Sequence, residues 1–339
     1  MPPSNTPYVS KVLTNFVAER QQDYGDDGYV MPWLMPFVGV NGPTGIFYKK
    51  TPNWKRLPAN YTQRGSKSPT NVKPDWSTDT DTYRIEDFAL MAETSRKDID
   101  NSEPNALLFS RQDEVAETQD TLMREHEIIG KQTLVNTLTG NSLRTGVASS
   151  PGANEFIHWD DSDDGQPLQD IERWCTYLLK TSGKSPNFAV IPKQVMSKLK
   201  FLSNFTQPTY QAVLNILTKE HFGDFFDIER IFIPKTTVDD AALGEDEEFD
   251  FIWGNEIILG YLPERPRKKV RAFGYTFVQT DVELGGVSES KPFRVRSYVD
   301  ESRGRGVYCD IVESFLAREI VDPTLYMRIS TPVSTVEDE

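Results

Sequence analysis

Residues 110–139 read SRQDEVAETQDTLMREHEIIGKQTLVNTLT and carry a helical pattern from end to end. Acidic residues lead the stretch, which suits the positive end of a helix dipole, and Gly140 follows it. Thirty residues at the α-helical rise would make a rod of about 45 Å. The pattern predicts one long helix, residues 110–139, with a single apolar edge. That edge is a narrow stripe of apolar residues: Val115, Leu122, Ile129, Val135 and Leu138.

The chain before this helix begins with a polar segment, residues 1–28, that contains Pro2, Pro3 and Pro7 and offers little to bury. Only residues 12–18 have the composition for a helical turn or two. We therefore expect an extended arm that is ordered only against something else.

Two strand-like runs follow, residues 46–50 and 80–94, and a loop rich in Pro, Asn, Ser and Arg separates them. Tyr83 and Ile85 fall on one face of the second run. Two strands joined by a long polar tip have too few large apolar residues for a core of their own. The pattern predicts a projecting β-loop.

The charge of the chain is unevenly distributed. The net charge is −14, yet residues 44–74 contain no Asp or Glu and seven cations, so the remainder of the chain stands at −14 − 7 = −21. Aromatic residues among the cations are costly to leave exposed, which favours a contact surface over a merely soluble loop. An identical chain is the nearest anionic partner, with DNA as the alternative. The predicted inter-subunit contact residues are Lys49, Lys50, Trp54, Lys55, Arg56, Tyr61, Arg64, Lys67 and Lys73.

A second basic cluster lies late in the chain and could contact the acidic loop, residues 239–250, of a neighbour around a ring. The alternative, a cluster that makes no such contact, carries equal weight. The cluster consists of Arg265, Arg267, Lys268, Lys269 and Arg271.

The remaining elements alternate and then become strand-rich, which predicts an α+β protein. Helices are expected at residues 168–180, 192–202 and 208–219, and strands at residues 188–191, 229–234 and 249–261. Beyond Pro266 strands are expected to dominate, at residues 272–279, 293–300, 306–314 and 325–329, with the middle two joined as a hairpin by the turn at residues 303–306.

Several fragments resemble catalytic motifs but are incomplete. His126-Glu127 begins a zinc-protease helix signature, yet Gly130 stands where the second His is required, so we expect a solvated His. Gly183-Lys184-Ser185 lacks the first glycine of a phosphate-binding loop and is predicted to be a turn. Residues 158–164 lack calcium-loop spacing and are interpreted as a solvated acidic loop rather than a cation site. We expect no catalytic, cofactor-binding or metal-ligating residues, and hence no enzyme.

Other exclusions follow from composition. The two cysteines, Cys175 and Cys309, are far apart, and we expect buried thiols in a reducing compartment rather than a disulfide. No apolar run is long enough to span a membrane.

The order of these parts, together with several local sequence motifs, resembles the major capsid proteins of tailed bacteriophages. Residues 158–164, then PLQDI (167–171) into a helix, then TSGKSPNFAVI (181–191), are similar to that family's passage into its axial domain. FIWGNEIILGYLP (251–263) followed by FGYTF (273–277) is similar to its later signature. The resemblance covers about residues 30–330 and implies the Hong Kong 97-type capsid fold, which encapsulins share.

By this resemblance the chain divides into the family's regions. They are an N-terminal arm (1–43), an extended β-loop (44–94), a peripheral domain (95–158 and 263–314) with the spine helix (110–139), an axial domain (159–262 and 315–330) and a C-terminal tail (331–339).

The resemblance further implies a coat protein that self-assembles into hexamers and pentamers of an icosahedral or prolate shell around phage double-stranded DNA. The expected location is the virion, after assembly in the cytoplasm of the host bacterium. Other expected partners are a portal, non-specifically packaged DNA and, since no long acidic N-terminal pro-segment is seen, a separate scaffolding protein; a decoration protein is a further candidate. Two alternatives stay open: an encapsulin-like compartment, and a nucleic-acid-binding protein that uses residues 49–73.

Overall fold

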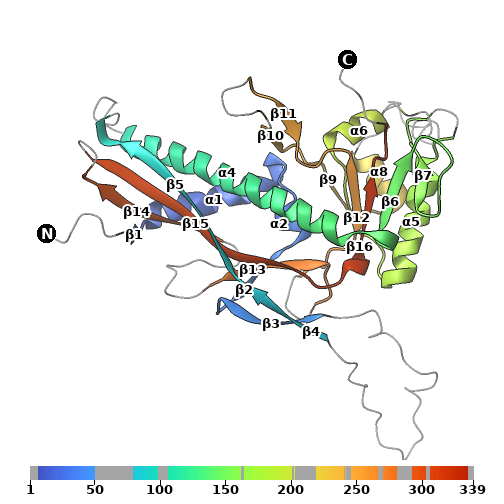
Figure 1. Cartoon of the computed structure of the whole chain (residues 1–339), viewed down its shortest axis with the longest axis horizontal. Helices are drawn as coiled ribbons and strands as arrows, with labels where there is room; N and C mark the ends of the chain where they lie inside the picture. Colours follow the sequence, from blue (N-terminus) through green and yellow to red (C-terminus); the bar gives the residue numbers. More distant parts are fainter. Residues whose placement is uncertain are drawn as a thin grey trace, which may run out of the picture.

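The structure of the chain is a computed structural model (Figure 1). It describes residues 7–49, 79–97, 106–161, 164–200, 202, 219–239, 241, 246–265, 270–280, 292–302 and 306–334; of residues 21–27, 106–110 and 220–221 only the backbone is described. Two six-stranded sheets lie at opposite ends of an elongated molecule, and the helix α4 runs between them.

The helix predicted from the sequence is α4, Ala106–Thr137, with a 3-10 turn, Gly140–Ser142, after it. Val115, Leu122 and Leu138 of the predicted stripe are buried. The buried face is wider than the apolar stripe because polar residues lie on it as well. Its other members are Thr118, Gln119, Met123, His126, Glu127, Gly130 and Leu134, at the helical spacing of three and four residues.

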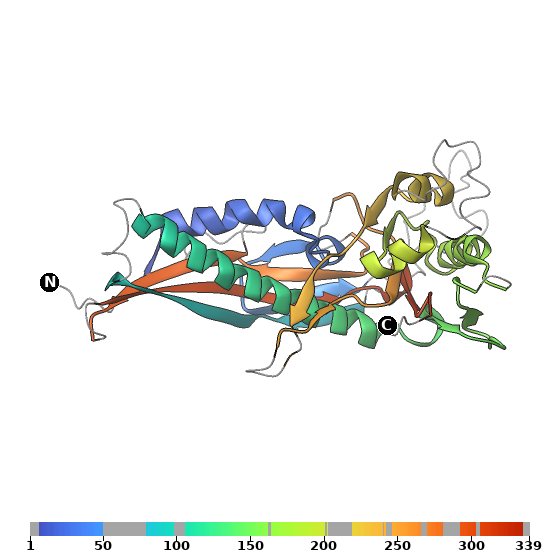
Figure 2. The same cartoon turned by 90° about the horizontal axis from the view of Figure 1, so that it is seen from above.

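The first sheet is built mainly from late strands. Its order is β1 (Tyr8–Val9), β14 (Phe293–Asp300), β15 (Val307–Ile320), β13 (Gly274–Gln279) and β2 (Phe37–Val40), and β5 (Glu86–Ser95) pairs with β15 along its other edge. The predicted hairpin is confirmed, since β14 and β15 pair antiparallel from Phe293↔Ser314 to Asp300↔Val307. Figure 2 shows α4 lying along this sheet, with α1 beside it.

The prediction of an extended N-terminal arm was wrong. Residues Lys11–Asp27 form the helix α1, which packs on α4 and β14. Leu13 and Val17 enter a core cluster with Val115 and Phe293, and Gln119 donates its side-chain N–H to the Val17 carbonyl. The short helix α2, Met31–Leu34, follows with a proline in its first turn. A few well-spaced apolar residues in a polar segment are enough to bury one face of a helix.

The second sheet forms the other end of the molecule. Its order is β7 (Glu155–Ile157), β6 (Leu143–Val147), β16 (Tyr326–Ser330), β12 (Glu256–Gly260), β8 (Phe188–Val190) and β9 (Arg230–Phe232). Helices α5 (Pro167–Ser182), α6 (Lys193–Leu199) and α8 (Lys219–Phe226) contribute to its core, in which Trp159 and Trp174 stack. Gly183 ends α5 at φ +69°, so the predicted helix-to-strand turn is confirmed. The helix expected at residues 208–219 lies almost entirely outside the described residues.

The sheets divide the chain differently from the predicted boundaries. Strands β6 and β7, expected in the peripheral unit, belong to the second sheet, and β15 continues to Ile320 in the first sheet. Residues 331–334, expected in a tail, pack instead: Val333 is buried, and the Ser334 N–H donates to Asp160.

Two small two-stranded ribbons are separate from both six-stranded sheets in their strand pairing. One pairs β3 (Thr44–Lys49) with β4 (Asp79–Arg84), and the other pairs β10 (Thr237–Asp239) with β11 (Phe249–Phe251). The expected β-loop of residues 44–94 is therefore shorter than predicted, because β5 belongs to the first sheet. In Figure 1 the two ribbons lie on opposite sides of the molecule.

Candidate inter-subunit surfaces

The β3–β4 ribbon has one face on the core and one face exposed. Phe47 and Tyr83 pack on Phe277 of β13, with ring centroids 5.5 Å and 4.7 Å from it. Side chains alternate along a strand, so Ile46 and Tyr48 lie on the opposite face, with 65% and 43% of their surface exposed. The ribbon is thus anchored at its base and offers an apolar face outward.

Of the predicted contact residues in this region, the structure describes only Lys49. Its ammonium lies 2.5 Å from the Asp81 carboxylate across the ribbon, and this hydrogen bond holds the pKa of Asp81 below its ordinary value. The others, Lys50, Trp54, Lys55, Arg56, Tyr61, Arg64, Lys67 and Lys73, lie outside the described residues.

The second predicted basic cluster is only partly a surface feature. Arg265 is exposed, and Arg267, Lys268 and Lys269 lie outside the described residues. The prediction for Arg271 was wrong, because its guanidinium is buried and pairs with Asp322. It also donates to the Ser182 carbonyl and, over 3.2 Å, to the Thr324 hydroxyl, so it joins the end of α5 to the chain before β16.

The β10–β11 ribbon was not predicted as a separate element. The expected single strand, residues 249–261, is interrupted by a turn at residues 252–255, where Gly254 has φ +52°. Val238 packs against the core, and the residues on the opposite face include Phe251 and Phe249, the latter 62% exposed. The outward face of this second ribbon carries one strongly exposed ring, Phe249, beside the exposed Asp239.

A buried carboxylate holds the base of this second ribbon to α4. Glu127 accepts hydrogen bonds from the backbone N–H groups of Val30 and Met31, each over 3.0 Å, and from Trp253 Nε1 over 2.7 Å. Trp253 lies in the turn directly after β11. Burial raises the pKa of Glu127, and Arg318, whose own pKa burial lowers to about 10, is the facing cation. One side chain therefore fixes α4, α2 and the β11–β12 turn relative to one another.

The neighbouring His126 overturns another expectation, because it is buried rather than solvated. Its ring lies 4.9 Å from that of Phe88 and 5.8 Å from that of Phe293, and Nε2 is 3.1 Å from the Ser314 hydroxyl. Burial lowers the pKa of His126 to about 3. Gly130, one turn further on, leaves room for Met31: a Cβ there would lie 2.5 Å from Met31 Cε, so the Met31 side chain would have to move.

The acidic loop at residues 158–164 also makes more contacts within the chain than the predicted solvated loop would. Trp159 is fully buried and donates to Asp170, while Asp160 accepts hydrogen bonds from Ser334 and pairs with Lys198 over 3.2 Å. These contacts fasten the C-terminal segment to the second sheet.

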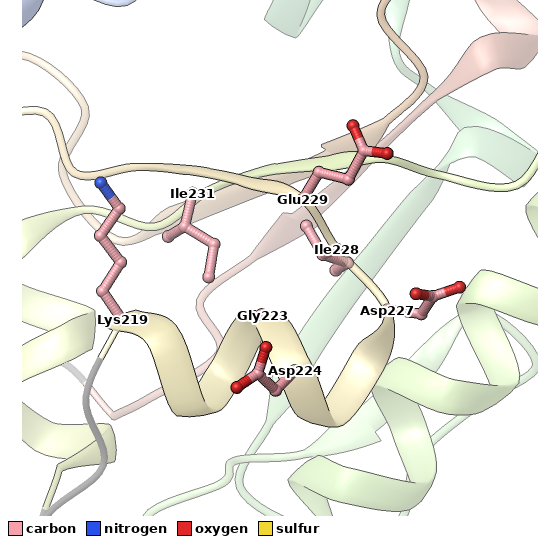
Figure 3. Close-up of a pocket in the computed structure, with 7 residues that line it drawn as sticks. All are labelled: Lys219, Gly223, Asp224, Asp227, Ile228, Glu229 and Ile231. Atoms are coloured by element: carbon pink, nitrogen blue, oxygen red, sulfur yellow. The ribbon is translucent and has the colours of Figure 1, made fainter.

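A pocket of about 420 Å³ opens between α8 and β9 (Figure 3). Three carboxylates line it, so it is a candidate for a metal-binding or catalytic site. The carboxylates of Asp224, Asp227 and Glu229 point in different directions and do not converge on one point. In the part of the chain that the structure describes, no three His, Cys, Asp or Glu side chains group to hold a metal ion. Cys175 and Cys309 are free thiols, and only Cys309 is fully buried.

Among the described residues, no helix is both long enough and apolar enough to cross a membrane. Exposed large apolar side chains in the described part of the chain lie on the outward faces of the two ribbons and at several other places. The latter are Tyr8, Val12, Trp33, the adjacent pair Leu90 and Met91, Leu179 and Phe225.

Two sheets joined by a long helix, with a projecting β-ribbon, define the α+β fold of Hong Kong 97-type shell proteins. The chain superposes on a phage-related protein from Bordetella bronchiseptica RB50 with a TM-score of 0.71 and 18% identity, over 98% of this chain and 100% of that one. It also matches the putative capsid protein of a prophage of E. coli CFT073, with a TM-score of 0.50 and 11% identity over 97% and 100% of the two chains.

A weaker likeness extends to the capsid of the cyanophage P-SCSP1u, with a TM-score of 0.49 and 10% identity over 88% of this chain and 86% of that one. Comparison of the sequence with models of protein families and with curated proteins finds no match.

Proposed function

We propose that this chain is the major coat protein of a tailed phage, and that its copies form hexamers and pentamers of a closed shell around double-stranded DNA. The observation that carries the proposal is the likeness of fold along the whole chain to a phage-related protein and a putative prophage capsid protein. Its role is structural rather than catalytic.

The two ribbons support assembly on physical grounds. A two-stranded ribbon without a core is marginally stable alone, and its exposed apolar face gains from burial against a neighbour. Many modest contacts per subunit then add up to a stable shell through multivalency. The acidic body, at −21 outside residues 44–74, suits a container that holds DNA without gripping it.

The test is electron microscopy of the purified chain beside a variant that lacks residues 50–75. We expect the full chain to form closed particles and the variant to remain a folded, soluble monomer. Particles of normal size from the deletion would refute the role assigned to residues 49–73, and a full chain that never assembles would refute the shell.

The contents of particles formed in cells distinguish a phage shell from an encapsulin-like compartment of the same fold. Nucleic acid inside favours a virion, assembled in the host cytoplasm with a portal and a separate scaffolding protein, whereas packaged protein cargo favours an encapsulin-like compartment. Binding of the unassembled chain to nucleic acid with a steep salt dependence would favour the nucleic-acid-binding alternative.

A further inference from the structure

A cavity of about 20 Å³ lies inside the chain, where α4 meets α2 and the first sheet. Its polar lining comes from His126 and Glu127 of α4, Thr276 of β13 and Arg318 of β15. Apolar side chains such as Phe293 line it as well. About 10–15 Å³ of such space is enough for one water molecule. The cavity therefore has room for one water and is too small for an organic ligand.

His126 brings an unsatisfied polar atom to this cavity. The side chain is buried, with 5% of its surface exposed. Its Nε2 is 3.1 Å from the Ser314 hydroxyl, but Nδ1 has no hydrogen-bond partner among the described residues. Buried polar atoms are nearly always paired, either with protein groups or with ordered water, because leaving one unpaired is costly. A water in the cavity would supply the partner that Nδ1 lacks.

The two charged groups at the cavity favour a neutral ligand that both donates and accepts. The Glu127 carboxyl group accepts three hydrogen bonds and retains acceptor capacity, since a carboxylate has about four lone-pair sites. The Arg318 guanidinium carries only donors. An anion in the cavity would lie near Glu127, and a cation would lie near Arg318. Water avoids both repulsions and can pair with either group.

The His126 ring can pair with water in either of its neutral forms. Burial, together with the charge of Arg318, lowers the pKa of His126 to about 3, so the ring is neutral near neutral pH. A neutral imidazole has one donor nitrogen and one acceptor nitrogen. If Nε2 donates to Ser314, Nδ1 accepts from the water; if Nε2 accepts, Nδ1 donates to it.

We propose that the cavity holds one ordered water molecule, hydrogen-bonded to His126 Nδ1 and to one or both of the Glu127 carboxyl group and the Arg318 guanidinium. The water is a fixed component of the joint between α4 and the first sheet. It lies inside one subunit, so its presence does not depend on contacts between copies.

The direct test is a density map of the wild-type chain, from crystals or from assembled particles, at a resolution that shows ordered waters. We expect one peak in the cavity, within hydrogen-bonding distance of His126 Nδ1 and of a second polar group. A cavity without a peak, in a map that shows other buried waters, would overturn the proposal.

Two variants test the assignment to Nδ1. H126F removes both ring nitrogens and should abolish the peak. S314A is the matched control, because it removes the partner of Nε2 and leaves Nδ1 in place, and it should keep the peak. A peak that persists in H126F would show that His126 is not its ligand. The wild-type map decides the proposal even where H126F does not fold.

The identity of the ligand needs a separate measurement, because a chloride ion beside Arg318 would give a similar peak. Crystals soaked in bromide distinguish the two, since bromide has an anomalous signal and water has none. We expect no anomalous signal in the cavity. A bromide peak there would overturn the water site in favour of an anion site, and either result leaves the proposed shell function standing.

Discussion

The region around Glu127 and the two ribbons differ in what they bury: the first buries a charged side chain, and the ribbons leave apolar side chains exposed. Around Glu127, a charge is buried and its three donors come from α2 and the β11–β12 turn of the same chain. On the ribbons, large apolar side chains such as Ile46 and Phe249 remain exposed. The contrast teaches that the chain's own contacts fix α4, α2 and the β11–β12 turn relative to one another, whereas Ile46 and Phe249 on the ribbons have no such cover among the described residues.

Other buried ion pairs follow the pattern of Glu127. Asp310 is buried and pairs with Arg111 over 2.6 Å, which fastens β15 to α4, and Arg271 pairs with Asp322 at the second sheet. A buried charge without a partner is costly, so each of these pairs specifies one arrangement of the elements that it joins.

The largest effect should come from E127A. It leaves the Val30 and Met31 N–H groups and Trp253 Nε1 without an acceptor, and it removes the strongest of the carboxylates that act on Arg318. We expect a loss of about 3–5 kcal/mol in the free energy of unfolding, measured by urea titration of the unassembled chain.

The matched control is E127Q, which keeps one acceptor oxygen but turns an NH₂ group toward a backbone donor. It should cost about 1–3 kcal/mol. Equal stability of E127A and the wild type would show that the joint between α4 and the β11–β12 turn does not depend on this carboxylate.

A smaller effect concerns pH. The pKa of His126 is lowered to about 3 in the folded chain and is about 6.5 when unfolded, so the unfolded chain binds more protons between these values. Stability should therefore fall as the pH drops below about 6.5, by up to about 1.4 kcal/mol per pH unit. Glu127 contributes with the opposite sign, because its pKa is raised: its contribution falls as the pH rises above the unfolded value.

H126Q removes this titration and keeps a polar side chain near Ser314. Between about pH 6.5 and about pH 5 it should lose about 1–2 kcal/mol less stability than the wild type. Urea titrations at several pH values measure the difference, and parallel curves for the two proteins would contradict the assignment to His126.

The sequence predicted the positions of helices and strands better than it predicted which residues pack against them. Periodicity located α4, the β14–β15 hairpin and the turn at Gly183, because these depend on local pattern. It missed Gln119, His126 and Glu127 on the buried face of α4, because a polar residue gives no hydrophobic signal and is buried only where a partner exists elsewhere in the chain.

The same limit explains the errors over Arg271 and the N-terminal segment. Arg271 was placed in an exposed cluster because its neighbours in sequence are basic, but its partner Asp322 is distant in the chain. Leu13 and Val17 were too few to indicate a helix alone, and they are buried because α4 and β14 complete their packing. Besides the buried Arg271, the structure describes two of the candidate contact residues, Lys49 and Arg265, and their role in assembly stays a prediction.

The smallest effect on stability should come from I46S/Y48S, and it separates the two regions most sharply. Both side chains are exposed in the single chain, so their loss should change the free energy of unfolding of the monomer by about 0.5 kcal/mol or less. Assembly should nevertheless be strongly weakened, because the apolar area that a second copy would cover is removed.

F47S, one residue away in β3, is the control: it empties a buried site against Phe277 and should destabilise the monomer itself by about 3–5 kcal/mol. Monomer stability by urea and particle yield by electron microscopy measure the two quantities separately. If I46S/Y48S assembled like the wild type, the outward face of the β3–β4 ribbon would be an exposed surface without a role between copies.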